Sequence, residues 1–161
     1  MKRISKIFLC LLCACSCISI SYAQKVGSYQ ESQIECLATE MDGSVTLRVT
    51  GTGKNKADAQ EQAKKNAVYA VIFEGIRDGK KGADYRPILT EVNARERYEE
   101  YFNIFFMDGG EYKKYVSMAD SKRHSKAKAT NKLYKSYRLT VRVLRSELKA
   151  RLKEDGVLKL Q

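Results

Sequence analysis

The chain has 161 residues, of which 43% are hydrophobic, and it carries 30 Lys and Arg against 19 Asp and Glu. This length and apolar content fit one globular domain with a core of its own. A single Pro and ten Gly exclude collagen-like and proline-rich chains. The sequence contains no recognisable catalytic or ligand-binding motif. It therefore says more about the cellular location and the fold of the protein than about its chemistry.

The first 23 residues have the three-part pattern of a bacterial secretory signal. A basic start (2–6) precedes an apolar run (7–20), and Ser21-Tyr22-Ala23 places small residues at both key positions of a cleavage site. We therefore predict an exported protein, periplasmic or secreted, whose mature chain starts at Gln24. An uncleaved anchor is an alternative, although the run is short for a membrane span. No later stretch is apolar enough to span, so we expect no transmembrane segment in the mature chain.

A competing interpretation is a lipoprotein signal. Leu12-Cys13-Ala14-Cys15 resembles a lipobox, in which Cys15 would be lipidated and acyl chains would anchor the chain to an envelope membrane. Four of the five Cys lie in the signal region, which leaves Cys36 alone after cleavage. A lone Cys cannot close an internal disulfide. We expect Cys36 to be a small buried strand residue, with an intermolecular bridge as the alternative.

Positive charge is concentrated in the last third of the chain. Residues 24–111 carry 12 basic and 15 acidic side chains, whereas 112–161 carry 15 basic and four acidic ones. A solvated loop is the favoured interpretation of such a cluster, and the alternative is a surface that attracts anionic partners over long range. No aromatic residue interrupts 121–131, which disfavours nucleic acid and leaves an anionic envelope surface or an envelope protein as partner. The densest part supplies the candidate anion- or partner-binding residues Lys122, Arg123, Lys126, Lys128, Lys132 and Lys135.

The first half of the mature chain predicts two strands and a helix. A flexible polar lead-in (24–32) precedes a strand over 33–39, an Asp-Gly turn, and a strand over 44–51 that alternates with period two. Asn55 is expected to cap a helix that runs to about Gly75. Small residues at helical spacing favour close packing of this helix on a sheet: Ala59, Ala63, Ala67 and Ala70.

The second half predicts two helices around two strands. After a connecting loop over 77–87, residues 92–106 are expected to form a helix with aromatic side chains at three- and four-residue steps, and a strand over 101–107 is the alternative. The remaining predictions are a strand over 112–118, a loop or hairpin through the basic segment, a strand over 133–143, and a helix over 145–155 that Gly156 ends.

These elements predict one α+β domain over residues 33–161. Its strand pairs are joined by turns or one long loop, which favours antiparallel pairing. The expected fold is a single antiparallel sheet of about four strands with three helices packed mainly on one face, in the order ββααββα. Polar residues would form the other face of the sheet: Thr46, Arg48, Thr50, Arg138, Thr140 and Arg142.

Two runs carry a resemblance to known proteins. The first is Val49-Thr50-Gly51-Thr52-Gly53, followed by Ala57, Ala59, Ala63 and Ala67 on a helix and then by Ile72-Phe73-Glu74-Gly75. It resembles the N-terminal domain of the flagellar assembly T protein and small outer-membrane lipoproteins of Gram-negative bacteria. The strand over 139–143, followed by the Leu148–Leu152 helix and Gly156, is similar to uncharacterised secreted proteins. The resemblance implies an α+β envelope domain with an assembly or scaffolding role, and it transfers no catalytic residue.

We predict a non-enzymatic interaction or structural module of the cell envelope, without a cofactor. His124 is the only His and lies in the basic segment, and Cys36 has no base nearby in sequence, although the two side chains could still meet in space. One His and one Cys without clustered spacing argue against a metal site. The alternative is a soluble module that binds a small ligand or a glycan through Tyr85, Tyr98, Tyr101, Tyr112, Tyr115, Tyr134 and Tyr137.

Overall fold

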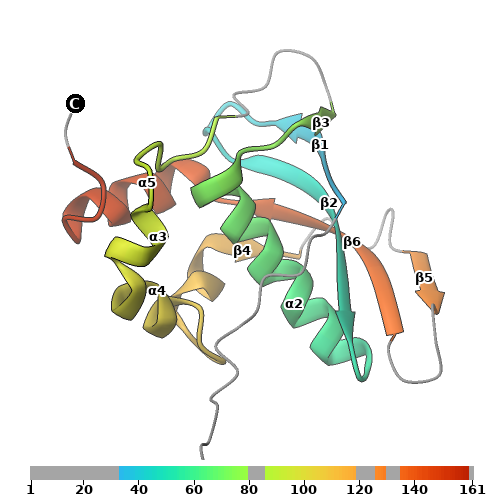
Figure 1. The fold of residues 1–161 in the computed structure, drawn as a ribbon. Coiled ribbons are helices and arrows are strands. Elements are labelled where there is room, and N and C mark those ends of the chain that lie inside the picture. The colour runs from blue at the N-terminus through green and yellow to red at the C-terminus, as the bar shows by residue number, and fades with distance from the viewer. Residues whose placement is uncertain (1–32, 80–85, 119–125, 130–134, 160–161) are drawn as a thin grey trace, which may run out of the picture.

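The structure is a computed structural model, and it describes residues 33–79, 86–118, 126–129 and 135–159. These residues form an α+β fold around one mixed sheet (Figure 1). The strands are β1 (Ile34–Thr39), β2 (Val45–Gly53), β3 (Asp78–Gly79), β4 (Val116–Ser117), β5 (Lys126–Ala129) and β6 (Lys135–Val143). The helical elements are α2 (Lys56–Tyr69), α3 (Ala94–Arg97), α4 (Glu99–Phe105), α5 (Arg145–Glu154), the π-helical turn η1 (Ala70–Glu74) and the 3₁₀ helix η2 (Glu111–Tyr115).

The sheet has the order β3-β1-β2-β6-β4, and β5 pairs with β6 beside this path. β2 and β6 are antiparallel from Val45 opposite Val143 to Gly53 opposite Lys135. The prediction of an entirely antiparallel sheet of about four strands is wrong at one edge, where the additional strand β3 pairs parallel with β1. A parallel pair needs a long crossover, and β2 with α2 supplies it here.

Helix α2 begins where the sequence predicts and packs closely on β2. The Asn55 side chain accepts a hydrogen bond of 2.9 Å from the backbone NH of Asp58, which satisfies a donor of the first turn. Ala59 and Ala63 are fully buried, and a Cβ built at Gly51 would lie only 2.1 Å from the Ala59 carbonyl oxygen. The predicted small-residue stripe therefore permits a close approach of helix and strand.

The aromatic segment forms two short helices instead of one. The predicted helix over 92–106 is interrupted at Tyr98, whose φ of −112° and ψ of 33° separate α3 from α4. The described residues consequently contain four α-helices, where the sequence predicted three. Ala94, Tyr98 and Phe102 keep a four-residue spacing through the break, so the side-chain pattern does not reveal it. The alternative strand over 101–107 is wrong, because α4 occupies most of it.

The predicted strand over 112–118 is wrong in its first half. These residues form η2, and only Val116 and Ser117 join the sheet as β4. Packing overrides the alternating pattern, because the Tyr112 side chain is fully buried and its hydroxyl donates a hydrogen bond to Glu61 of α2. The later predictions agree with the structure: β5 and β6 form an antiparallel pair, and α5 ends just before Gly156, whose φ is 72°.

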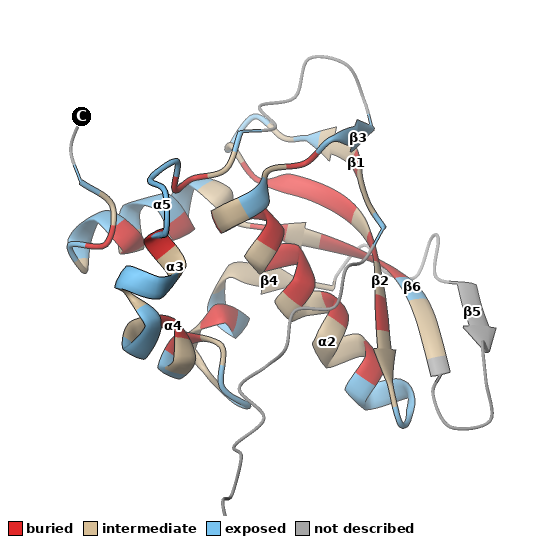
Figure 2. Cartoon of the chain, in the orientation of Figure 1, coloured by how far each residue is buried: buried red, intermediate tan, exposed pale blue. Residues whose placement is uncertain are grey.

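The two faces of the sheet differ in character. Figure 2 shows buried residues along β2 and along α2 where these two elements meet. Leu148 and Leu152 of α5 belong to the same core. On the other face, the guanidinium of Arg48 pairs with the Glu35 carboxylate at 2.8 Å. Two further contacts join β6 to the residues on either side of β1: Arg138 with Gln33 and Arg142 with Glu40.

Within the described ranges, every helix is too short or too polar to cross a bilayer.

Candidate functional site: a basic groove beside the last helix

Helix α5 carries an apolar stripe and a basic stripe side by side. Leu148 and Leu152 are fully buried in the core. Arg145, Lys149 and Lys153 are also four residues apart, so they lie along one face of the helix. This basic stripe lines a groove and forms what we call its helix wall.

The loop wall of the groove is the segment over residues 86–91, which precedes α3. The backbone NH of Ile88 donates to the Val71 carbonyl at 3.0 Å, and that of Leu89 donates to the Ile72 carbonyl at 2.9 Å. Both acceptors lie in η1, the π-helical turn at the end of α2. Carbonyl groups in the last turn of a helix lack intrahelical partners, and here the loop wall supplies them. The loop wall is thereby fixed to the long helix.

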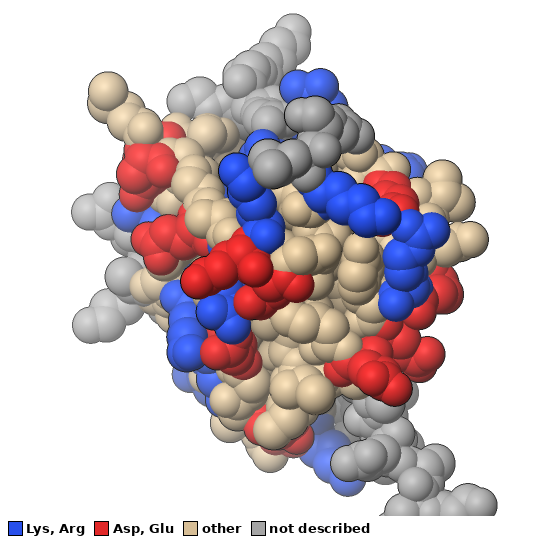
Figure 3. Space-filling model, turned by 90° about the vertical axis from the view of Figure 1, so that its left-hand side faces the viewer, with Lys and Arg blue, Asp and Glu red and all other residues tan. Residues whose placement is uncertain are grey.

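Five basic side chains and one acidic side chain line the groove, which has a volume of about 740 Å³, a size common among binding pockets. The apolar lining is largely buried, so the charged groups define the rim. Figure 3 views the end of the molecule toward which α5 extends, where basic and acidic side chains form small separate groups with uncharged surface between them. The charged lining residues are Arg86, Arg145, Lys149, Lys153, Lys159 and Glu91, and the apolar ones are Pro87, Ile88, Leu89, Val157 and Leu158.

A hydrogen bond at the rim joins the two walls. Nη2 of Arg145 donates to the backbone carbonyl of Arg86 at 2.9 Å. The acidic lining residue, Glu91, is paired with Arg97 of α3. By contrast, Lys149 and Lys153 are exposed and have no ion-pair partner among the residues that the structure describes. The groove therefore presents uncompensated positive charge.

On the side away from the groove, a network of polar contacts attaches α5 to α4 and η2. Tyr101 of α4 donates a hydrogen bond of 2.6 Å from its hydroxyl to Oδ2 of Asp155, and Nε of Arg151 lies 2.9 Å from the same oxygen. Arg151 also pairs with Glu111 of η2 at 3.4 Å. Burial and the Asp155 carboxylate raise the pKa of Tyr101, so its hydroxyl stays a donor. These contacts fix the rotation of α5 that turns its basic stripe toward the groove.

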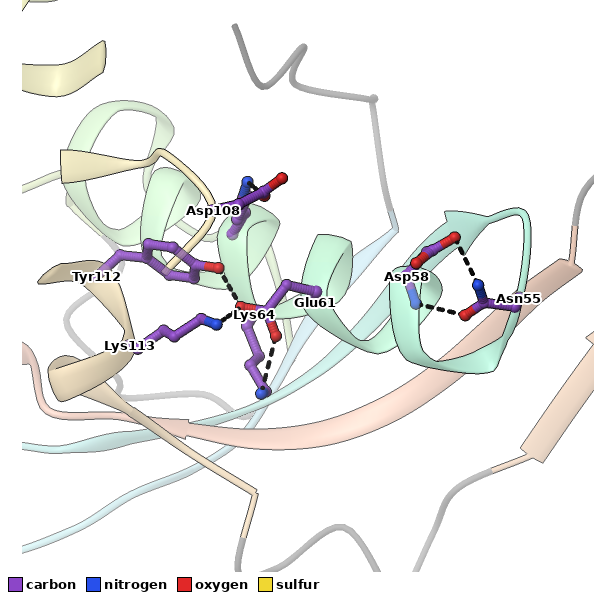
Figure 4. A network of polar contacts seen from close by, with 8 residues as sticks. Asn55, Asp58, Glu61, Lys64, Asp108, Tyr112 and Lys113 are labelled. Atoms are coloured by element: carbon purple, nitrogen blue, oxygen red, sulfur yellow. Dashed lines mark hydrogen bonds and ion pairs between the residues drawn. The ribbon is translucent and has the colours of Figure 1, made fainter. Parts of the chain in front are cut away.

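A second polar cluster joins α2 to η2 (Figure 4). The Glu61 carboxylate accepts a hydrogen bond from the Tyr112 hydroxyl and pairs with Lys113 at 2.9 Å and Lys64 at 3.2 Å. Burial alone would raise the pKa of Glu61, but these donors outweigh it and lower the pKa to about 2. Because the Glu61 carboxylate is ionised and already has three partners, we interpret it as a structural contact that holds η2 against α2. No three His, Cys, Asp or Glu side chains gather closely enough in the described residues to hold a metal ion.

Only some of the binding residues that the sequence predicted lie in the ranges that the structure describes. Lys126 and Lys128 lie in β5 opposite Arg138 and Ser136, and Lys135 begins β6. Figure 1 shows β5 and α5 on opposite sides of the molecule. Their role in binding an anion or a partner stays a prediction, because the other candidates lie outside the described residues: Lys122, Arg123, Lys132 and the lipidation candidate Cys15.

Cys36 lies on β1 and its side chain is buried, as expected for a small strand residue. Its Sγ is 3.6 Å from the Ala38 carbonyl oxygen, to which it donates a weak hydrogen bond. His124 lies outside the described residues, so the hypothesis of a Cys36–His124 pair has no structural test.

The tyrosines of the alternative hypothesis are spread over several elements. Tyr112 and Tyr115 stack on Phe106 and Phe105, with ring centroids 6.0 and 6.1 Å apart, and so complete the aromatic part of the core. Tyr101 points its hydroxyl at α5. The described tyrosines therefore do not line the groove, and two others lie outside the described ranges: Tyr85 and Tyr134.

The groove itself was missed by the sequence interpretation, which placed the basic site at residues 121–135. A usable signal was present, because Arg145, Lys149 and Lys153 recur every four residues in a predicted helix. The loop wall had no such signal. Residues 86–91 become part of the site only through their long-range hydrogen bonds to η1.

Comparison of the chain with protein-family models, with curated proteins and with solved structures gives no match.

Proposed function

We propose that this protein is an exported, non-enzymatic module of the cell envelope that binds an anionic partner through its basic groove. The observation that carries the proposal is the groove lining, in which five basic side chains face one acidic side chain that already has a partner. The resemblance to small envelope domains agrees with an assembly or scaffolding role. Four of the five basic lining residues, Arg145, Lys149, Lys153 and Lys159, belong to the basic last third of the chain, which the charge distribution singles out.

The physical chemistry of the groove supports a multivalent anion rather than an isolated charge. A single exposed ion pair contributes little, about 0 to 1 kcal/mol. Several cations along one recess add their attraction, and the apolar lining lowers the local dielectric constant around each contact. An anionic partner that covers the recess would also remove apolar surface from water.

Export is the second part of the proposal, and intact mass of the protein from its source cells tests it. A mass that starts at Gln24 in the soluble envelope fraction supports a periplasmic or secreted module. A mass with acyl chains on Cys15 in the membrane fraction supports the lipoprotein alternative. A full-length mass in the cytoplasm contradicts export.

The binding test uses the double variant Lys149→Gln/Lys153→Gln, which removes two unpaired charges and leaves the buried leucines of α5 in place. Binding of the mature chain to isolated envelope fractions is measured by co-sedimentation, and thermal unfolding by circular dichroism checks the fold. We expect binding to weaken several-fold with unchanged unfolding. The matched control is Lys54→Gln/Lys56→Gln, which removes two exposed charges at the start of α2. Equal binding of all three proteins would contradict the proposal.

A further inference from the structure

We infer that the anionic partner is a protein that lays an extended segment into the groove, with acidic and apolar side chains alternating along it. This inference rests on the proposed function and specifies the occupant of the same site. Three features of the groove carry it: the spacing of the basic stripe, the apolar surface beside that stripe, and the recessed shape between two joined walls.

The first feature is the spacing of positive charge. Successive members of the stripe Arg145, Lys149 and Lys153 are four residues apart, which corresponds to about 6 Å along a helix axis and about 12 Å in total. In an extended chain, alternate residues point to the same side and are about 6.6 to 6.8 Å apart. Acidic side chains at three alternate positions of an extended segment therefore match the three cations one to one.

The second feature is the apolar lining. The intervening residues of an extended segment point away from the acidic ones. In the groove, Pro87 of the loop wall and Leu158 beyond α5 are half-buried, whereas the lining residues Leu89 and Val157 are buried. This partly exposed apolar surface lies within the same recess as the cations, so apolar side chains at the alternate positions have a surface to cover.

The third feature is shape, and it separates a peptide from other anions. The hydrogen bond from Arg145 to the Arg86 carbonyl holds the two walls together, so the site is a recess rather than a flat patch. A planar bilayer surface can reach the exposed lysines of the rim but not the apolar lining between the two walls. A compact phosphate group needs cations that converge on a point, whereas three of the five lining cations follow one another along a face of α5.

The test compares two peptides of the same composition and charge, each flanked by Gly-Ser and labelled for fluorescence anisotropy. One has the sequence Glu-Leu-Glu-Leu-Glu, and the other has the block order Glu-Glu-Glu-Leu-Leu. We expect the mature chain to bind the alternating peptide roughly tenfold more tightly than the block peptide. Lys149→Gln/Lys153→Gln should remove this preference, and Lys54→Gln/Lys56→Gln should keep it.

The outcomes separate the inference from the proposed function. If both peptides bind equally and both depend on Lys149 and Lys153, the alternating segment is overturned and the anionic groove stands. If vesicles of phosphatidylcholine with about one fifth phosphatidylglycerol bind through these lysines and neither peptide does, the partner is a lipid surface and the inference fails. If no anionic probe responds to the loss of these two lysines, the proposed function fails as well.

Discussion

Arg145, the first residue of α5, donates a hydrogen bond of 2.9 Å to the backbone carbonyl of Arg86 in the loop wall. The two residues are 59 positions apart in the sequence. On its other side, the loop wall is bound to η1 through the backbone of Ile88 and Leu89. The groove is therefore held by contacts on both sides of one short segment.

Replacing Arg145 with Leu tests this relationship. The variant keeps the aliphatic part of the side chain and removes the donors to the Arg86 carbonyl. We expect the free energy of unfolding to change by less than about 1 kcal/mol, because the hydrogen bond is exposed. Hydrogen exchange at the Ile88 and Leu89 amides should become faster, because the loop wall loses its hydrogen bond to α5. Lys149→Leu is the control, and equal exchange in all three proteins would show that Arg145 does not hold the loop wall.

Binding in the groove should depend on ionic strength. The cations at the rim are exposed, and salt screens such charges over about 8 to 10 Å at physiological concentration. The dissociation constant for an anionic partner should rise steadily as salt increases from about 0.05 M to about 0.5 M. The slope should be shallower for Lys149→Gln/Lys153→Gln than for the unmodified chain. A salt-independent dissociation constant would mean that charge does not drive the association.

Gly51→Ala tests the close packing of α2 on β2. The added Cβ would lie 2.1 Å from the Ala59 carbonyl oxygen and 2.6 Å from the Ala63 nitrogen, so helix and strand must separate. We expect a loss of about 1 to 3 kcal/mol in the free energy of unfolding, measured by urea denaturation. Thr52→Ala on the same strand should cost less than Gly51→Ala. Equal effects of the two substitutions would contradict the close approach.

Glu61→Gln tests the anchor between α2 and η2. Donors lower the pKa of Glu61 from 4.5 to about 2, so its ionised form stabilises the fold above pH 4.5 and this stabilisation is lost as the pH falls toward 2. At neutral pH, the variant should be less stable by about 1 to 2 kcal/mol, a discounted value because the carboxylate is partly exposed. The difference between the two proteins should shrink as the pH approaches 2. A difference that stays constant with pH would exclude the ionised carboxylate as its source.

The parts of the fold that follow from local chemistry could be predicted from the sequence. Asn55 caps α2 through its own side chain, and the alternating residues of β2 and β6 place one face in the core. The parts that depend on distant contacts could not be predicted. Tyr112 lies in a 3₁₀ helix because Glu61 binds its hydroxyl from α2. β3 joins the sheet with only two residues, too few to carry an alternating pattern.

The candidate site also has one part that could be predicted from the sequence and one part that could not. The basic stripe of α5 can be recognised in the sequence as a four-residue repeat. The binding site was nevertheless predicted at residues 121–135, because basic residues are denser there. The loop wall is visible only in the structure, because its position depends on carbonyl groups of η1. The net charge indicated an anionic partner, whereas the recess that would receive it arises from packing.

The most direct test of the central claim is a two-dimensional NMR titration of the mature chain with a hexaglutamate peptide. The account predicts that amide shifts concentrate at residues 86–91 and 145–159, the two sides of the groove, and that Lys149→Gln/Lys153→Gln abolishes them. Shifts that concentrate at residues 121–135, or that persist unchanged in this variant, would contradict the groove as the anion-binding site.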